Sequence, residues 1–229
     1  MSLYAVSDLR KSYQVGDVVT HALRGVDLTI ERGEFTAIAG PSGSGKSTLL
    51  HLMGALDRPD AGQVVLDGTR IDRLERRKAA RMRLDRMGFV FQAYNLIPVL
   101  SALENAAFVL ELRGVDRRTR EARARDALAA LGMEGFETRM PNQLSGGQQQ
   151  RVAVARALAG DPDIILADEP TANLDSTTGQ HLIDLLRRLN EDRGVTFVFS
   201  THDPRLLGHV RRIVHLEDGR VDGAPLEAA

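Results

Sequence analysis

The chain has no cysteine, no dominant sign of charge and no long apolar run. Without cysteine it can form neither a disulfide framework nor a thiolate metal site, which fits a reducing compartment and makes the cytoplasm the expected location. Its 30 basic and 31 acidic residues give a net charge of −1, so composition does not point to nucleic acid. No apolar run approaches the roughly 20 residues that cross a bilayer, and residues 1–8 lack the basic start of a secretory signal. We therefore expect a chain that is not exported and that reaches a membrane only through a partner.

Hydrophobic residues make up 43% of the 229 positions and occur mainly as short runs between helical patterns. Such runs, each ending in polar residues or glycine, are typical of buried strands in a parallel sheet. They lie at residues 35–39, 88–91, 164–167 and 195–200. Residues 63–66 and 212–216 are each followed by an Asp-Gly turn, which predicts antiparallel additions. The sequence thus predicts an α/β fold with a mostly parallel sheet.

Between residues 93 and 159 the strand signals disappear and helix signals replace them. Ser101-Ala102-Leu103-Glu104 has the spacing of a capping box and predicts a helix that stops near Gly114. Residues 116–132 predict a second helix ending at a glycine. We interpret residues 1–229 as one domain, in which 1–92 and 160–229 form an α/β core with an N-terminal antiparallel β subdomain and 93–159 form an inserted α-helical subdomain.

A glycine-rich loop follows the apolar run at 35–39. Its residues fit the pattern G-x-x-x-x-G-K-[ST] in full, between a predicted strand and a predicted helix, as a phosphate loop requires. They are Gly40, Pro41, Ser42, Gly43, Ser44, Gly45, Lys46, Ser47 and Thr48. In such a loop the backbone wraps the phosphates, Lys46 reaches the β- and γ-phosphates, and the Ser47 hydroxyl binds Mg²⁺. The motif predicts a nucleotide site with magnesium.

Three other strand ends carry polar residues, and open α/β sheets bind ligands at the carboxyl ends of their strands. Asp168 and Glu169 follow the run at 164–167, where Asp168 is predicted to hold Mg²⁺ and Glu169 to orient and polarise the attacking water. Gln92 is predicted to ligand the metal, and His202 to contact the γ-phosphate and the water. Each residue alone is better explained as an ordinary turn or cap residue, but their combination with the phosphate loop favours a phosphoryl-transfer site.

A second candidate anion site precedes the helix predicted at residues 149–158. Its sequence is Leu144-Ser145-Gly146-Gly147-Gln148, in which Ser145 and Gln148 have capping-box spacing and the glycines leave backbone N–H groups open. A helix start of this kind attracts an anion. Taken alone, the pattern would be a well-capped helix and nothing more.

Together these motifs resemble the ATP-binding subunits of ABC transporters over nearly the whole chain. The resemblance implies a P-loop NTPase core whose Walker A motif is Gly40–Thr48 and whose signature is Leu144–Gln148. It implies that the remaining motifs are the Q-loop, Walker B strand with its catalytic glutamate, D-loop and switch histidine, carried by Gln92, Ile164–Glu169, Asn173–Asp175 and His202. The catalytic residues it implies are Glu169, His202 and Lys46, with ATP and Mg²⁺ as ligands.

In this family two copies dimerise head to tail around two ATP–Mg. The resemblance therefore implies that Ser145 and Gly147 contact the ATP of a second copy of this chain. It also implies integral membrane permease subunits as partners, no nucleic acid, and a cytoplasmic location on the inner face of the cell membrane. Tyr13 lies where the family places an aromatic that stacks on adenine, just before a first β-strand; an ordinary edge-strand tyrosine is the alternative.

Finer features resemble the lipoprotein-releasing and macrolide-export subgroup, notably residues 19–27, 87–92, 94–98 and 168–175. One alternative is a cell-division-type ATPase that signals through a permease-like partner without transport, and it is compatible with the sequence. A soluble ABC ATPase that acts on nucleic acid or ribosomes is disfavoured, because the chain has one cassette and no sustained heptads. A non-hydrolysing module is disfavoured because the catalytic residues are present.

Two segments are candidate contacts for a membrane or a permease. Residues 70–86 contain eight basic residues against three acids, which suits anionic lipid or the edge of a permease. The balanced overall charge favours instead a solvated helix with Leu74, Met82 and Leu84 turned inward. Residues 94–100 supply apolar side chains in a polar region, which favours contact with a permease over packing between lobes.

Overall fold

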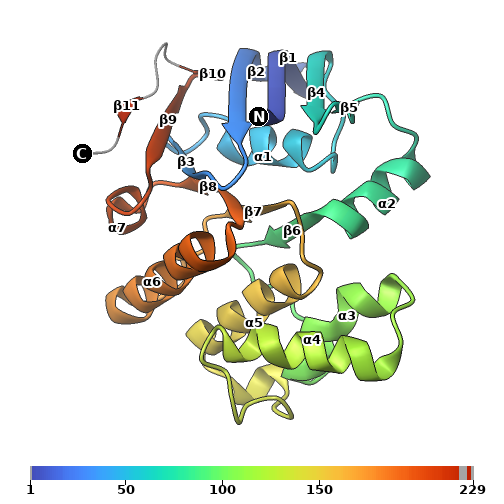
Figure 1. Cartoon of the computed structure of the whole chain (residues 1–229). Coiled ribbons are helices and arrows are strands. Elements are labelled where there is room, and N and C mark those ends of the chain that lie inside the picture. The colour runs from blue at the N-terminus through green and yellow to red at the C-terminus, as the bar shows by residue number, and fades with distance from the viewer. Residues whose placement is uncertain (1, 222–225, 228–229) are drawn as a thin grey trace.

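The computed structural model describes residues 2–221 and 226–227, and its N-terminal part is an antiparallel sheet (Figure 1). The strand order in this sheet is β2-β1-β4-β5. Its strands are β1 (Ser2–Val15), β2 (Val18–Glu31), β4 (Ala61–Leu66) and β5 (Thr69–Arg70). The predicted strand at 63–66 is therefore confirmed as part of an antiparallel subdomain.

The larger sheet has the order β10-β9-β3-β8-β7-β6, with β11 also paired to β9. Its strands are β3 (Phe35–Ala39), β6 (Met87–Val90), β7 (Ile164–Asp168), β8 (Thr196–Thr201), β9 (Arg212–Glu217), β10 (Arg220–Val221) and β11 (Leu226–Glu227). The prediction that residues 212–216 form an antiparallel addition was right only in part, because β9 pairs in parallel with β3 but antiparallel with β10 and β11. The Asp-Gly turn leads into β10, which is antiparallel to β9.

The helices divide between the sheets and one end of the molecule. They are α1 (Lys46–Met53), α2 (Arg76–Arg86), α3 (Ala102–Leu112), α4 (Arg117–Ala129), the 3₁₀ turn η1 (Pro141–Gln143), α5 (Gly146–Ala159), α6 (Ser176–Arg193) and α7 (Pro204–Leu207). Helices α3, α4 and α5 lie together, at the end of the molecule opposite the antiparallel sheet (Figure 1). The predicted fold class is thus confirmed.

Local signals set the ends of the two predicted helices in this segment. Ser101 caps α3 in a reciprocal capping box with Glu104, as predicted, and α3 ends at Leu112. Asp116 accepts a hydrogen bond from the Thr119 backbone amide and caps α4. None of the helices in the described part of the chain combines the length and the apolarity that a bilayer crossing requires.

The central strands are buried on both faces, which is why their sequences are continuously apolar. In β7, Ile164 and Leu166 belong to a core shared with α1 and the antiparallel sheet. Ile165 and Ala167 point to the other core, which includes α5 and α6. The alternation follows from the two-residue period of a strand. One sheet therefore lies between two hydrophobic cores, with one core packed on each face.

Most of the basic segment forms α2, whose first half is largely exposed and whose second half is half-buried, which fits the favoured interpretation of a solvated helix with one inward face. Ala79 is the buried residue of this helix, and Met82 is half-buried against the core below it. At its end Arg86 pairs with Asp67 and Asp163, at 2.7 and 2.5 Å. Ion pairs within the protein thus neutralise part of the positive charge of this segment.

An ion-pair cluster around Asp203 joins two loops at the carboxyl edge of the sheet. The Thr171 hydroxyl, in the loop after β7, donates to Asp203 at 2.6 Å. The Arg205 guanidinium donates to both Asp203 oxygens at 2.7 to 3.1 Å and to the Ser176 carbonyl at 3.0 Å. The loop after β8 is thereby fixed to the loop after β7 and to the start of α6.

This cluster predicts a pH-dependent contribution to stability. Burial raises the pKa of Asp203, but hydrogen bonds from Arg205 and Thr171 outweigh burial and lower the pKa to about 2. A carboxyl pKa that is lower in the folded state stabilises the fold above the unfolded-state pKa, and this stabilisation is lost as the pH falls through the folded-state pKa. We expect Asp203→Asn to lower the free energy of unfolding by about 1–2 kcal/mol at neutral pH.

Urea titrations of wild type and Asp203→Asn at pH 7 and near pH 3 measure this difference, with the exposed Asp192→Asn as the control. The difference between wild type and Asp203→Asn shrinks at the lower pH if the ion pair is its source. An equal difference at both pH values contradicts the assignment.

Candidate active site

The glycine-rich loop connects β3 to α1 and is shaped by close backbone contacts. Gly45 has φ 105°, and a side chain there would collide with the carbonyl oxygen of Ala22. Lys46 is 8% exposed, and its ammonium donates to the carbonyls of Gly40 and Pro41 at 2.8 and 2.9 Å. Among the described residues the buried Ser44 hydroxyl has no hydrogen-bond partner. The loop thus brings together the Lys46 ammonium and the unpartnered Ser44 hydroxyl. A cation and a free hydrogen-bond donor suit the binding of a polyphosphate.

A hydroxyl and a carboxylate meet beside this loop. The Ser47 hydroxyl at the start of α1 donates to Asp168 Oδ1 at 3.0 Å. Asp168 ends β7 and also accepts a hydrogen bond from Ser200, its register partner on β8. The part of the chain that the structure describes contains no group of three or more His, Asp or Glu side chains able to hold a metal. The pair fits Mg²⁺, which is often held by one or two carboxylates together with substrate phosphates.

The next carboxylate, Glu169, contacts the predicted switch histidine. Glu169 Oε1 lies 2.8 Å from His202 Nδ1, and its Oε2 accepts a hydrogen bond from the Thr201 hydroxyl at 3.3 Å. An ionised carboxylate only accepts hydrogen bonds, so the imidazole donates. The Glu169 side chain is 15% exposed and that of His202 is 73% exposed. A carboxylate and an imidazole therefore stand together at the end of adjacent strands.

Most of the predicted nucleotide-site residues line one cavity of about 610 Å³. This volume is within the range of small-molecule sites. Its lining includes Tyr13, Pro41, Ser42, Gly43, Gly45, Lys46, Ser47, Thr48, Gln92, Glu169 and His202. The sheet edge thus brings together side chains from β1, the glycine-rich loop and the loops after β6, β7 and β8.

Tyr13 lies at this cavity but not where the sequence had placed it. It belongs to β1, opposite Thr20 of β2, and does not precede the first strand. The residue is 39% exposed, and its hydroxyl donates to Asp57 at 3.0 Å. The Lys11 ammonium lies 5.1 Å from the ring centroid. The hydroxyl and the ring of Tyr13 thus each have a partner, while the residue still lines the cavity.

The predicted signature lies elsewhere in the same chain. The Gln148 backbone amide donates to Ser145 Oγ at 3.3 Å, and the Ser145 amide donates to Gln148 Oε1 at 2.9 Å, which is the predicted capping box. Helix α5 begins at Gly146, earlier than the predicted residue 149, because the glycines form its first turn. Gly147 packs so closely on Thr178 that a Cβ would collide with it. None of residues 144–148 is among the described residues that line the 610 Å³ cavity.

The loops around the cavity are tied by contacts that sequence reasoning missed, although it had assigned Asn173–Asp175 to the D-loop. Asn173 donates to the Gln92 carbonyl at 2.9 Å and joins the predicted D-loop to the predicted Q-loop. Asp175 caps α6 by accepting from the backbone amides of Thr177 and Thr178, and these bonds lower the pKa of its carboxyl. The resemblance to the family named this loop but did not indicate the hydrogen bond from Asn173 to Gln92.

Arg156 was also missed, although it carried a signal. It is the single charged residue in the otherwise apolar run at 152–159 of α5. Its guanidinium donates to the carbonyls of Tyr94 and Asn95, the former at 2.9 Å, and both of these residues have positive φ. A lone charge in a buried helical run indicates a specific internal partner, since burying an unpaired charge is costly.

Comparison with known proteins places this arrangement in a family. The ABC transporter family model matches residues 23–172. The ABC transporter ATP-binding protein MJ0796 of Methanocaldococcus jannaschii is 47% identical over 95% of this chain and 94% of its own length. The lipoprotein-releasing system ATP-binding protein LolD of Geobacter metallireducens is 46% identical, over 96% of this chain and 98% of its own.

A larger protein and two solved structures are also similar to this chain. The macrolide export ATP-binding/permease protein MacB of Syntrophobacter fumaroxidans is 44% identical over 97% of this chain, which spans 31% of that protein. A dimeric structure of the MJ0796 cassette matches with a TM-score of 0.91 over 99% of both chains, at 44% identity. Another, of a post-hydrolysis dimer of MJ0796 bound to ADP and Pi, matches with a TM-score of 0.90. The chain therefore belongs to the ABC transporter family, as an ATP-binding cassette with ATPase activity.

Proposed function

We propose that two copies of this chain bind ATP between them, head to tail, and hydrolyse it. The observation that carries the proposal is the separation of two anion-binding motifs within one chain. The cavity holds Gly40–Thr48, whereas Ser145 is exposed at the start of α5 and does not line it. A second copy, turned to face the first, would supply the missing signature to each cavity. The dimeric structures of MJ0796 support this arrangement.

Within each site the residues divide the chemistry. Ser47, Gln92 and Asp168 would hold Mg²⁺, which supplies charge neutralisation at the phosphates when bound. Lys46 would leave the carbonyls of the loop and contact the β- and γ-phosphates. Glu169 would orient the attacking water.

Two further contacts would complete the site. His202 would hold the γ-phosphate next to the Glu169 carboxylate, to which its imidazole already donates. Tyr13 would stack on the base.

Replacing the proposed water-orienting carboxylate should separate binding from hydrolysis. We expect Glu169→Gln to keep ATP binding and to lose hydrolysis by on the order of a hundredfold or more, because the amide keeps the shape but cannot act as a base. The trapped ATP should hold the protein as a dimer. Phosphate release and size-exclusion chromatography with ATP measure the two effects, with the exposed Glu111→Gln as the control. Turnover near the wild-type rate would contradict the assignment.

We further propose that the cassette drives a separate integral membrane permease of the lipoprotein-release or macrolide-export type, and that it lies on the inner face of the cell membrane through this partner. The names of the LolD and MacB relatives support the subgroup. In this proposal the permease provides the membrane anchor.

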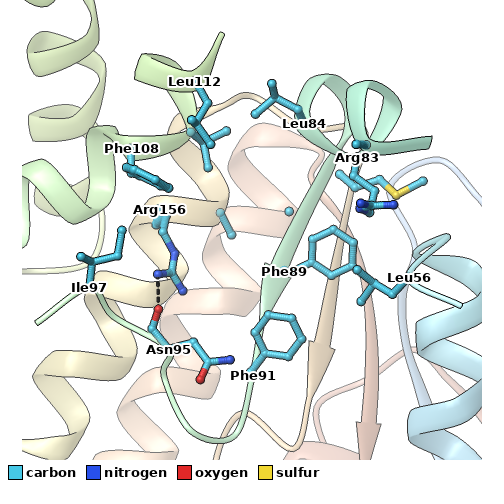
Figure 2. Close-up of a pocket in the computed structure, with 15 residues that line it drawn as sticks. Leu56, Arg83, Leu84, Phe89, Phe91, Asn95, Ile97, Phe108, Leu112 and Arg156 are labelled. Atoms are coloured by element: carbon cyan, nitrogen blue, oxygen red, sulfur yellow. Dashed lines mark hydrogen bonds between the residues drawn. The ribbon is translucent and has the colours of Figure 1, made fainter. Parts of the chain in front are cut away.

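The permease would dock in an apolar groove between α2, β6 and the helical subdomain (Figure 2). This groove has a volume of about 620 Å³ and is lined by Leu56, Phe89, Phe91, Ile97, Phe108 and Leu112, among others. Leu56 is 44% exposed and Leu112 is 56% exposed, which leaves apolar surface uncovered at the rim. Asn95 and Ile97 belong to the segment at 94–100 that the sequence singled out. An apolar helix end presented by a permease matches this groove.

A charge in the groove should uncouple docking from ATP hydrolysis. We expect Leu112→Asp to lose the permease when the tagged chain is purified from detergent-solubilised membranes, because docking would have to remove a carboxylate at the exposed rim from water. The ATPase rate of the purified cassette should stay near wild type. Val15→Asp is the control, since Val15 is 79% exposed at the hairpin between β1 and β2, outside the groove lining. Equal recovery of the permease with both variants would contradict the docking site.

A further inference from the structure

A buried glutamine of α5 contacts the loop that carries the hydrolytic carboxylate. Gln150 is 0% exposed, and its Nε2 donates to the Pro170 carbonyl at 2.7 Å. A carbonyl only accepts, so the side-chain atom facing it must be the amide nitrogen. Gln150 Oε1 has no partner among the described residues. Among the described residues this buried side chain thus makes one hydrogen bond. Its acceptor, Pro170, is the residue that directly follows Glu169.

The backbone at Glu169 needs such a restraint. Its φ is 47°, in the left-handed region that non-glycine residues rarely adopt. The following proline further disfavours helical conformations at this position. Strained residues persist only where the surroundings determine them, and they cluster at functional sites.

Two hydrogen bonds from other elements hold the backbone around Glu169, one at its own amide and one at the carbonyl of Pro170. Within the loop, the Glu169 carbonyl accepts from the Ala172 amide at 3.2 Å. The Glu169 amide donates to the Ser200 carbonyl at 2.9 Å and fixes the peptide before it. The bond from Gln150 to Pro170 fixes the chain after it.

We propose that Gln150 is a positioning residue for hydrolysis: by holding the Pro170 carbonyl, it keeps Glu169 in its strained conformation with the carboxylate at the ATP cavity. Without this donor the loop relaxes and the carboxylate moves away from the water that it orients. ATP binding does not depend on this bond, because Gln150 does not line the cavity.

The position of Gln150 has a second consequence, which rests on the proposed head-to-tail dimer. Gln150 lies on α5, one turn beyond the signature residues Ser145 and Gly147. The start of this helix would contact the ATP of the partner copy, whereas Gln150 holds Glu169 of its own copy. Each hydrolytic carboxylate is therefore attached to the helix that serves the other site.

The first test separates kcat from KM. Gln150→Met keeps the length and burial of the side chain and removes the donor. We expect kcat for ATP to fall between about tenfold and a hundredfold with KM unchanged, since a small misplacement of a catalytic group has effects of this size. Asn190→Leu is the matched control, because Asn190 is a buried amide that donates to the Gly33 and Val195 carbonyls. It should lose stability and keep kcat.

The second test asks which copy the change affects. Heterodimers are isolated with two different tags, and Lys46→Ala inactivates the site of one copy. In one pair Gln150→Met is on the copy with the intact Lys46, so the working site uses the altered copy's Glu169. In the other pair both changes are on the same copy, which contributes only its signature to the working site. Lys46→Ala paired with wild type is the reference.

We expect the rate to fall only in the first pair, relative to the reference. An equal or larger loss in the second pair would mean that Gln150 acts through the signature, and it would overturn the proposal even if the variant is less stable. A kcat near wild type for the Gln150→Met homodimer would also overturn it. A reference pair without activity would mean that the two sites hydrolyse ATP only together, and the kcat comparison of Gln150→Met with Asn190→Leu would then decide on Gln150. Failure of the proposed dimer would show separately, as a Glu169→Gln protein that stays monomeric with ATP.

Discussion

The parallel adjacency of β3, β8 and β7 is the constraint on which the rest of the structure depends. Because Ala39 is level with Thr201, and Ser200 with Asp168, the chain leaves these strands at one edge. That edge receives the glycine-rich loop, the two acidic residues and the histidine from positions far apart in the sequence. Asp168 of β7 accepts hydrogen bonds from Ser47 of α1 and Ser200 of β8, which join a helix and two strands at this edge. The cavity therefore follows from the register of a sheet that is buried on both faces.

The loop at residues 169–175 is where the subdomains meet. It is held by Gln150 of α5 at Pro170, by Asp203 at Thr171, and through Asn173 by the carbonyl of Gln92. Helix α5 thus has a direct polar contact with the segment that carries the hydrolytic carboxylate. Movements of α5 that accompany binding of a second copy would reach this loop without an intermediate element.

The sequence predicted those parts of the structure that local patterns determine. The run at 35–39 became β3 with the same bounds, and the spacing of Ser145 to Gln148 produced the capping box. The direction of β9 and the place of Tyr13 within β1 were not predicted, because strand pairing depends on residues distant in the chain. The role proposed for Gln150 was not predicted, because it depends on a hydrogen bond to a residue 20 positions away in the chain. The site roles of the predicted residues stay predictions.

The central claim, a site completed by a second copy, is tested most directly by disulfide cross-linking. The absence of native cysteine makes the chain a clean background for Ser42→Cys and Ser145→Cys in the Glu169→Gln protein. Both positions are exposed in the single chain. The account predicts a disulfide between two copies that forms with ATP and not without nucleotide, seen as a dimer on a non-reducing gel. A cross-link that forms equally without ATP, or none with ATP, would contradict it.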